Sequence, residues 1–380
     1  MHFTTATYDK KEQEAMNETA EESNQYTSQA DFEKLTTLVS AEFQIEEALM
    51  EHDLPTYYLK QPQETKQPFL RLLKNLEAMN LIALLRRKNE RIFLKIVPKP
   101  PVKSSNILIN WTLFFATIAT TFVTGYMLSR GLVEEGAMSN PFVGGATFTI
   151  AIMAVLGMHE MGHKLTADKK GIEATPPYFI PGPPPVLGIF GIGTFGAVIM
   201  QKSLPPNKDA LFDVGANGPI VGFILSVIVS IVGLLYSPRF PIPPEGINGL
   251  PAPLIFEIFA IFVVNLPTDY YILLHPVATA GWVGMVVTML NLLPAAMLDG
   301  GHVARSLVGE KTRSILTFMS ILLLIISGFW PMAIFVLFIS MRKHPGPLDD
   351  VSSLSTNRKL LTIGLIAIFV LCSFPIVSIF

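Results

Sequence analysis

The sequence has little charge and almost no cysteine. Only 15% of its 380 residues are charged and 50% are hydrophobic, whereas an average soluble domain carries about a quarter charged residues. A single soluble globule is therefore excluded. The one cysteine, Cys372, excludes an intrachain disulfide and a zinc finger built on cysteines. The net charge of −2 lacks the basic excess typical of nucleic-acid-binding proteins, so we expect no nucleic-acid partner.

The charge that is present is concentrated near the N-terminus. Residues 1–103 hold 16 acidic and 14 basic residues, which is 30 of the 58 charged residues in the chain. This distribution predicts a modest polar part followed by an integral membrane part. Residues 1–30 are acidic and poor in large apolar side chains, so we expect a disordered tail. They show neither a signal-peptide nor a transit-peptide pattern.

Residues 31–98 have the patterns of a small soluble α+β domain. Apolar residues recur at helical spacing over 32–39 and again over 69–79, and residues 43–59 between them are expected to be extended. The apolar runs 81–85 and 92–97 flank a polar stretch, as in a β-hairpin. We interpret the domain as a structural or regulatory cap, with substrate recruitment as the alternative.

A proline-rich linker, residues 99–105, is expected to lead into a membrane domain, residues 106–380. A membrane-spanning helix needs about 20 apolar residues. Residues 252–268 are apolar but short, so an interfacial or re-entrant segment is expected there.

The run 314–341 could be one kinked span or a helix with a short return. The fold class predicted is a polytopic α-helical membrane protein with about six to seven spans, within residues 106–129, 136–158, 214–238, 270–298, 314–341 and 360–380.

Residues 172–203 cannot form a helix, because proline and glycine recur throughout them. The run 193–200 within them has strand-like content. Non-helical backbone at membrane depth is tolerated only where protein buries it or where it lines a wet cavity. We therefore predict a membrane-dipping β-hairpin that packs against the spans.

Lysines next to the predicted spans indicate the orientation. Lys95, Lys99 and Lys103 precede the first span and predict a cytoplasmic N-terminus, because positive residues favour the cytoplasmic side. The basic residues up to 313 agree with this orientation. Those beyond it leave the side of the C-terminus open.

The motif that carries chemistry lies at the end of the second predicted span. His159-Glu-Met-Gly-His163 matches the pattern H-E-x-x-H. Residues i and i+4 share one face of a helix, so both imidazoles can bind one Zn²⁺, and the adjacent Glu160 can act as general base for a water molecule. Ionisable groups inside a membrane are costly and usually functional, which favours a zinc site over a merely solvated helix face.

A catalytic zinc site needs a third protein ligand and an open position. The candidates are His275, His302 and acids near the ends of spans. Asp299 stands out because it ends a long apolar run on the same predicted side as His159, and because Gly300 and Gly301 follow it. An aspartate before glycines can also be a simple turn or cap. His302 is interpreted as an interfacial polar group, with a supporting role at the site as the alternative.

These motifs together resemble the site-2 protease family of intramembrane zinc metalloproteases, peptidase family M50. The resemblance rests on H-E-x-x-H in one span and on Asn291-Leu-Leu-Pro-Ala-Ala-Met-Leu-Asp299-Gly in a later one. The run Gly193-Thr-Phe-Gly196, with Gly218-Pro219 and His344-Pro-Gly346, is similar to the branch that archaea and bacteria share with the plastid proteases named for ethylene-dependent gravitropism deficiency. The resemblance covers about residues 105–380 and more weakly the N-terminal domain.

The resemblance implies a role for each matching residue. It implies Zn²⁺ as the cofactor and Glu160 as the catalytic base. Asn291, about two helical turns before Asp299, is implied as a contact to the substrate carbonyl, or else a packing amide. The strand expected over 193–200 would offer an edge that binds an unwound substrate as an added strand. The metal ligands implied are His159, His163 and Asp299, and the substrate-binding residues are Asn291, Gly193, Thr194, Phe195 and Gly196.

The expected partners are single-span membrane proteins and the lipid bilayer, and the expected location is the plasma membrane of a prokaryote. A metal-ion transporter that uses the same His and Asp cluster is the main alternative. It would need further intramembrane acids or histidines along a path, and the sequence has few. A prenyl-protein peptidase would need a different acidic motif, and an inactive homologue would usually have lost a ligand or the base.

Overall fold

The computed structural model describes residues 29–101, 105–185, 191–242, 251–267, 269–341 and 344–374. The chain forms two compact units. The first consists of Met1–Val102, Pro206–Lys208 and Pro347–Ser353, and the second contains the remaining residues. The expected disordered tail lies outside the described residues except for its last two positions, as do residues 102–104 of the expected linker.

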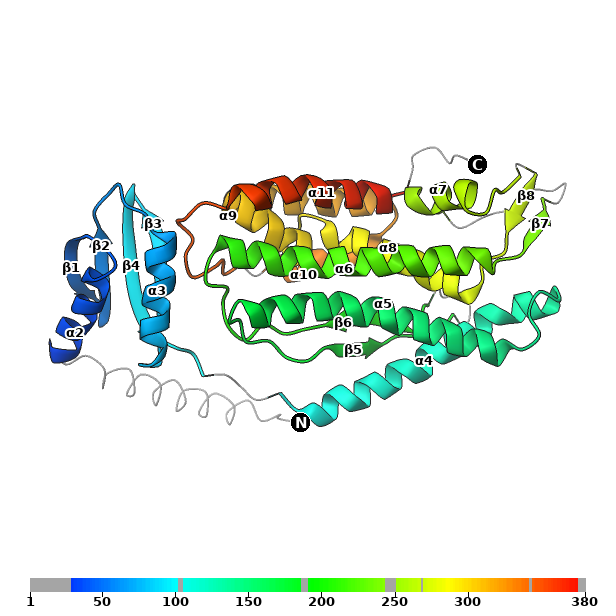
Figure 1. The fold of residues 1–380 in the computed structure, drawn as a ribbon, viewed down its shortest axis with the longest axis horizontal. Coiled ribbons are helices and arrows are strands. Elements are labelled where there is room, and N and C mark those ends of the chain that lie inside the picture. Colours follow the sequence, from blue (N-terminus) through cyan, green and yellow to red (C-terminus); the bar gives the residue numbers. More distant parts are fainter. Residues whose placement is uncertain are drawn as a thin grey trace, which may run out of the picture. The chain divides into compact units, whose positions relative to one another are not determined.

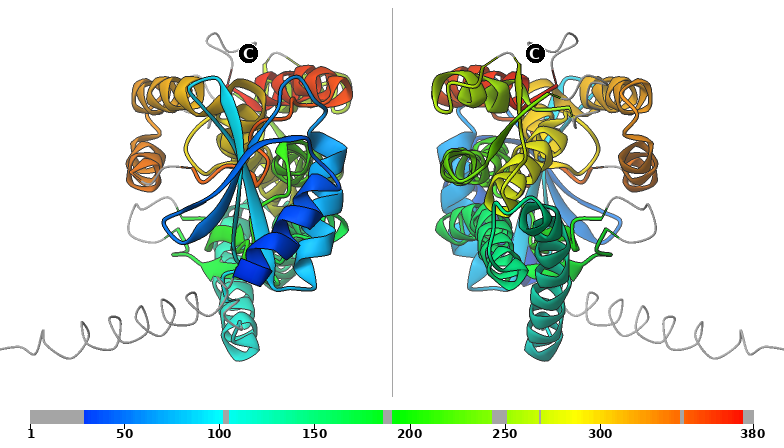
Figure 2. Two further views of the ribbon diagram at one scale, coloured as in Figure 1. Left: turned by 90° about the vertical axis from the view of Figure 1, so that its left-hand side faces the viewer. Right: turned by 90° about the vertical axis from the view of Figure 1, so that its right-hand side faces the viewer.

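The first unit has the α+β architecture that the sequence predicts. Its strands form an antiparallel sheet in the order β1-β2-β4-β3, and its two helices lie against that sheet (Figure 2). The elements are α2 (Gln29–Ser40), β1 (Ile45–Glu51), β2 (Leu54–Leu59), α3 (Lys66–Glu77), β3 (Leu81–Lys88) and β4 (Arg91–Pro98).

Local sequence explains this sheet. Both hairpins turn through two residues with positive φ, His52-Asp53 and Asn89-Glu90, which is the backbone that matches the twist of paired strands. Along β3 and β4 every second side chain is buried, as expected for a sheet with one covered face. The buried side chains pack as a core that includes Val39, Tyr57, Phe69, Leu72, Leu76, Leu85, Leu94 and Ile96.

The edge strand β3 is covered by a segment from far along the chain, which the sequence did not indicate. The backbone N–H of Leu85 donates to the carbonyl of Leu348 at 2.9 Å, and the N–H of Asp350 donates to the carbonyl of Leu85 at 3.2 Å. The N–H of Asp349 donates in turn to the carbonyl of Pro206 at 3.0 Å. The segment around Asp349 thus bonds to an edge that would otherwise expose unpaired backbone groups, and Pro206 bonds to the other side of that segment.

The second unit is mostly helical (Figure 1). Among the residues that the structure describes, three helices, α4, α5 and α6, are long and apolar enough to cross a membrane. Large apolar side chains such as Ile107, Leu108 and Phe115 of α4 point outward, with exposures of 59%, 69% and 61%. The chain is an integral membrane protein. The helices are α4 (Ile107–Glu134), α5 (Pro141–Lys169), α6 (Lys208–Leu235), α7 (Leu254–Phe262), α8 (Pro276–Leu292), α9 (Asp299–Ile326), α10 (Trp330–Ser340) and α11 (Thr356–Cys372).

Two of the predicted spans differ from the observed helices. The run 270–298 contains only the 17 residues of α8 as helix, because Pro276 begins that helix and Pro294 disfavours helical backbone at Leu293. The run 314–341 is divided between α9 and α10 at Gly328, whose φ is 79°. It is therefore a helix with a short return. The helix α9 also begins earlier than predicted, at Asp299, and has a break at Gly309.

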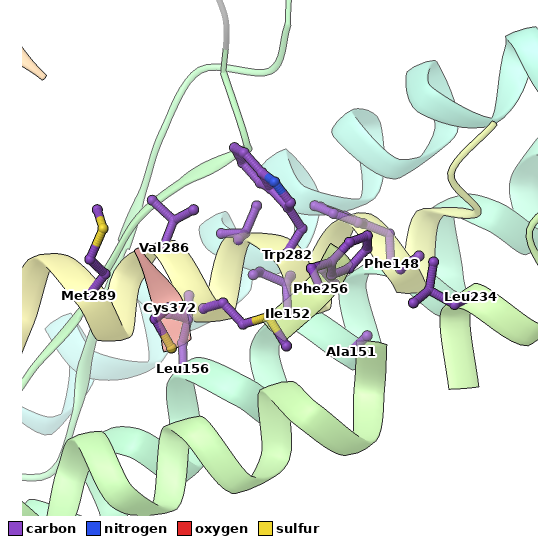
Figure 3. Packing of buried hydrophobic residues seen from close by; sticks show 14 of the residues in the cluster. Phe148, Ala151, Ile152, Leu156, Leu234, Phe256, Trp282, Val286, Met289 and Cys372 are labelled. Atoms are coloured by element: carbon purple, nitrogen blue, oxygen red, sulfur yellow. The ribbon is translucent and has the colours of Figure 1, made fainter. Parts of the chain in front are cut away.

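The core of the second unit joins five helices. Side chains of α5, α6, α7, α8 and α11 meet in one apolar cluster (Figure 3). Phe148 and Ile152 of α5 are fully buried against Trp282 and Met285 of α8. This packing holds α5, which carries the H-E-x-x-H motif, next to the helix that leads to Asp299.

The predicted β-hairpin is present. Strand β5 (Tyr178–Pro181) pairs antiparallel with β6 (Thr194–Val198), and the residues between them are described except for 186–190. The predicted interfacial segment, residues 252–268, contains the short helix α7. A further pair of short strands, β7 (Arg239–Pro241) and β8 (Tyr270–Ile272), was not predicted.

Candidate metal centre

The helix α5 presents His159, Glu160 and His163 as three buried side chains, with exposures of 3%, 8% and 5%. The helix begins at Pro141, which needs no hydrogen-bond donor at that position, and Asn140 caps it by accepting from the N–H of Phe142 at 2.9 Å. The motif lies ten to six residues before the helix ends at Lys169. A regular helix there places the two imidazoles on one face.

The ligand atoms of the two histidines and Asp299 converge. Nε2 of His159 and Nε2 of His163 are 3.1 Å apart. Oδ2 of Asp299 is 3.2 Å from the first and 3.3 Å from the second. Ligand atoms held about 2.0–2.1 Å from a tetrahedral zinc lie about 3.3 Å from one another. These three residues therefore fit a zinc ion with one coordination position left open.

A second hydrogen bond orients His163. Its Nδ1 atom is 2.7 Å from the carbonyl oxygen of Val214 on α6. Because a carbonyl oxygen can only accept, Nδ1 carries the proton, and Nε2 is left with a free lone pair. A backbone carbonyl that fixes the tautomer of a histidine in this way is typical of metal sites. The sequence did not indicate Val214, since any residue can supply a carbonyl.

Three glycines of α6 allow that helix to approach the site. A methyl group on Gly218 would lie 2.1 Å from Nε2 of His163, and one on Gly222 would lie 2.7 Å from Nδ1 of His159. One on Gly215 would lie 2.8 Å from the carbonyl oxygen of Asp299. Their spacing of three and four residues puts them on one face of α6. This spacing was the signal in the sequence that could have identified α6 as a wall of the site.

Glu160 is bonded to the β-hairpin. Its Oε2 atom accepts a hydrogen bond of 2.9 Å from the N–H of Ile199, the residue that follows β6. Its carboxylate also lies within 4.8 Å of the ligand atoms of both histidines. The acid is thus held beside the metal ligands and next to the end of a strand, where it can exchange a proton with a water molecule at the open position.

A family model matches the part of the chain that contains this cluster. Residues 147–327 match the model of Peptidase family M50, and the match includes the H-E-x-x-H motif, Asn291 and Asp299. This segment is similar to peptidase family M50. The resemblance found in the sequence is therefore confirmed.

Several proteins to which the chain is similar are plastid proteins. The chain is 30% identical over 249 residues to the probable zinc metalloprotease EGY1, chloroplastic, of Oryza sativa subsp. japonica. The match covers 62% of this chain and 42% of that protein. It is 31% identical over 232 residues to the probable zinc metalloprotease EGY2, chloroplastic, of Arabidopsis thaliana, covering 57% and 38%. The chain thus spans less than half of these curated relatives. None of the solved structures matches it significantly.

The other residues singled out from the sequence lie at different distances from the candidate metal ligands. The amide nitrogen of Asn291 is 3.4 Å from Nε2 of His159, at the edge of the site. His302 lies one turn after Asp299, and its Nδ1 is 2.8 Å from Nε2 of His344. His275 caps the start of α8 by accepting from the N–H of Val277 at 3.2 Å. His275, a candidate ligand on the sequence alone, therefore acts as a helix cap.

The four hairpin residues also differ from one another. The carbonyl of Gly193 accepts from the hydroxyl of Thr120 at 2.6 Å, and the hydroxyl of Thr194 donates to the carbonyl of Ile180 at 2.8 Å. Phe195 is 73% exposed. Gly196 has a φ of 104°, a conformation that glycine adopts readily. The first two residues anchor the hairpin, and the next two present its surface.

Proposed function

We propose that this protein is an intramembrane zinc metalloprotease that hydrolyses peptide bonds of transmembrane-helix substrates. The observation that carries the proposal is the convergence of three ligand atoms 3.1–3.3 Å apart beside the carboxylate of Glu160. His159, His163 and Asp299 would hold the metal. Zinc bound there would lower the pKa of a water molecule and polarise the scissile carbonyl.

The other residues would then act on the water and the substrate. Glu160 accepts the proton of the attacking water and passes it to the leaving amine. Asn291, at the edge of the site, donates a hydrogen bond to the substrate carbonyl where negative charge develops. Both roles agree with the positions of these side chains 3–5 Å from the ligand atoms.

Substrate binding is assigned to the β-hairpin. A transmembrane helix bonds its own amides internally, so it must unwind locally before water can attack. An unwound segment that pairs with β6 as an added strand has its backbone satisfied by the hairpin. The exposed Phe195 and the bond between Ile199 and Glu160 support this assignment, because they put a surface residue and the catalytic acid at the two ends of the same strand.

The proposal also includes the orientation of the protein in the membrane and the membrane in which it lies. Lys95 and Lys99, before the first long helix, favour a cytoplasmic N-terminal unit, and water would then reach the site from the cytoplasmic side. We assign the protein to a prokaryotic plasma membrane with single-span membrane proteins as substrates.

The experiment compares membrane proteomes of cells that express the wild type or Glu160→Gln. A single-span protein should accumulate uncleaved in the variant. The purified wild type should then cleave that protein in proteoliposomes, and Glu160→Gln should retain about one zinc without cleaving it. Glu135→Gln, in the exposed turn after α4, is the matched control and should cleave normally. Cleavage by Glu160→Gln at the wild-type rate would refute the mechanism, and zinc transport that survives this substitution would favour a transporter.

A further inference from the structure

The turn between α8 and α9 has an unusual backbone. Ala296 has a φ of 47°, in the left-handed region that residues with a Cβ atom seldom adopt. The turn ends at Leu298, which is the N-cap residue of α9, and the helix itself begins at Asp299. A conformation of this kind persists only where the surroundings enforce it. The contacts of Ala296 therefore decide how the third metal ligand is placed.

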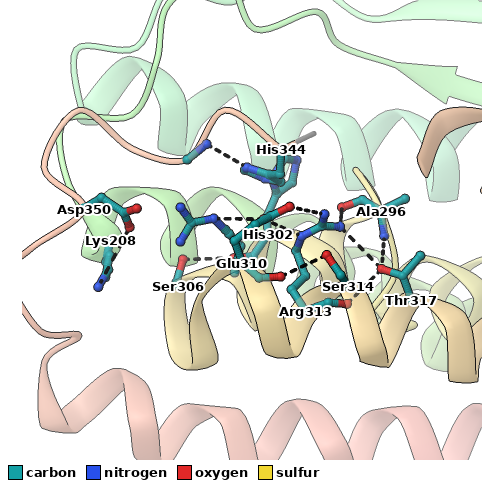
Figure 4. A network of polar contacts seen from close by, with 12 residues as sticks. Lys208, Ala296, His302, Ser306, Glu310, Arg313, Ser314, Thr317, His344 and Asp350 are labelled. Carbon is teal, nitrogen blue, oxygen red and sulfur yellow. Dashed lines mark hydrogen bonds and ion pairs between the residues drawn. The ribbon is translucent and has the colours of Figure 1, made fainter. Parts of the chain in front are cut away.

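Two side chains from the later part of α9 hold Ala296 (Figure 4). Its N–H donates to the hydroxyl of Thr317 at 3.0 Å, and its carbonyl accepts from Nη1 of Arg313 at 3.0 Å. Arg313 and Thr317 are buried, with exposures of 4% and 5%. Buried backbone groups need such partners, and at membrane depth water is not there to replace them.

The two holding groups are themselves fixed in orientation. Nε and Nη2 of Arg313 donate to the two carboxylate oxygens of Glu310 at 2.9 and 2.7 Å. Such a bidentate pair sets the plane of the guanidinium group, and it directs Nη1 at Ala296. The hydroxyl of Thr317 donates to the carbonyl of Arg313 at 2.9 Å, and its lone pairs accept from the N–H of Ala296 at 3.0 Å and from Nη1 of Arg313 at 3.4 Å.

The turn is packed directly against the first turn of α9. A methyl group on Gly301 would lie 2.5 Å from the carbonyl oxygen of Ala296, and one on Gly300 would lie 2.2 Å from that of Leu292. With no side chains between them, a shift of the turn is transmitted to the start of the helix. Asp299 would then lose its distance of 3.2–3.3 Å from the histidine nitrogens. Active sites lose function when their groups move by about 0.5 Å.

We propose that Arg313 and Thr317 are positioning residues for the zinc site, which hold Ala296 in its left-handed turn so that Asp299 reaches His159 and His163. This inference rests on the proposed function, because it assumes that these three residues bind zinc. If Arg313 bonded only to Glu310, its role would be merely structural. Because Arg313 and Thr317 also bond to the backbone of Ala296, they can position Asp299.

The test uses the purified full chain and zinc alone as the probe. Thr317→Val keeps the shape of the side chain and removes the hydroxyl, and Arg313→Met removes the donor to Ala296. Zinc affinity is measured by competition with a chromophoric chelator, and the absorption spectrum of the Co²⁺-substituted protein reports ligand geometry. Substitution of groups that orient metal ligands typically costs about 10–100-fold in affinity. We expect a loss of that size and an altered spectrum for both variants.

Two further variants separate positioning from folding. Arg313→Lys retains one donor and should recover part of the zinc affinity. Thr121→Val removes a fully buried hydroxyl that bonds only its own helix α4, so it should bind zinc as tightly as the wild type does. Thr317→Val decides the question even where Arg313→Met does not fold.

The outcomes are distinguishable. If the wild type binds zinc and Thr317→Val binds it equally tightly with an unchanged Co²⁺ spectrum, the positioning role is wrong and the proposed function stands. If the wild type itself binds no zinc, the proposed function is wrong and the positioning role falls with it.

Discussion

The backbone N–H of Ile199 donates a hydrogen bond of 2.9 Å to the carboxylate of Glu160. This bond connects the end of β6 with the residue that follows His159, the first of the proposed metal ligands. A carboxylate held by a backbone group keeps its position without needing a charged partner. The hairpin therefore has a second role besides presenting a strand edge, because it also orients the acid.

Removal of this N–H should slow the reaction without removing the metal. Ile199→Pro lacks the donor, and a hydrogen bond to a charged group is worth about 1.5–3 kcal/mol, so we expect cleavage to slow about 10–100-fold. Zinc content should stay near that of the wild type. Ile199→Ala keeps the N–H and is the control. Normal cleavage by the proline variant, measured in proteoliposomes, would show that the bond does not matter.

The close approach of α6 should make Gly218 intolerant of a side chain. In Gly218→Ala the new methyl group would meet the His163 ring 2.1 Å from Nε2, so the ring must move and zinc affinity should fall more than about tenfold. Alanine is otherwise the better helix former, which makes a loss due to helix propensity unexpected. Gly364→Ala on α11, where nothing lies within 4 Å, should leave zinc affinity unchanged. Equal affinities of the two variants would contradict the packing described for α6.

Zinc should stabilise the folded protein through Asp299. A ligand that binds only the folded state adds about 2.7 kcal/mol at one hundred times its dissociation constant, so the unfolding temperature should rise with zinc concentration. Asp299→Asn loses one of three ligands and should need at least about 100-fold more zinc for the same rise. A thermal-shift titration measures both. Identical titration curves would remove Asp299 from the ligand set.

His344 should make stability depend on pH. It lies in the loop between α10 and α11. Burial, together with the neighbouring His302, Arg313 and Arg305, lowers the pKa of its imidazole well below the usual value of 6.5. The folded state keeps this imidazole neutral, whereas the unfolded chain binds a proton as pH falls below about 6.5. Its contribution to stability is therefore present above that pH and is lost as the pH falls.

The expected result is a fall of the unfolding temperature between about pH 6.5 and pH 5 that is shallower in His344→Asn than in the wild type. Asparagine can still accept from the N–H of Gly346, as Nδ1 of His344 does at 2.9 Å. The difference in slope then reports protonation and not the loss of that bond. Equal slopes would mean that His344 is not the group that titrates.

The residues that could be predicted from the sequence are those whose relation is local. His159 and His163 are four residues apart in a helix, and that spacing alone puts their rings on one face. The hairpin of β3 and β4 followed from two apolar runs that flank a polar stretch, whereas the sequence indicated β1 and β2 only as extended backbone. The third proposed ligand, Asp299, was one candidate among several on the residues alone, because nothing in its neighbourhood along the chain points to α5. Its assignment came from the resemblance to a family.

The groups that orient the site depended on the tertiary structure. Val214 and Ile199 act through backbone atoms that every residue has, so no residue type marks them. The segment that covers β3 comes from more than 250 residues away, and the two bonds to Ala296 come from a helix that begins after it. The sequence by itself determined which side chains can bind a metal and which segments prefer a bilayer. Only packing decided which backbone groups meet them, because those contacts join residues far apart in the chain.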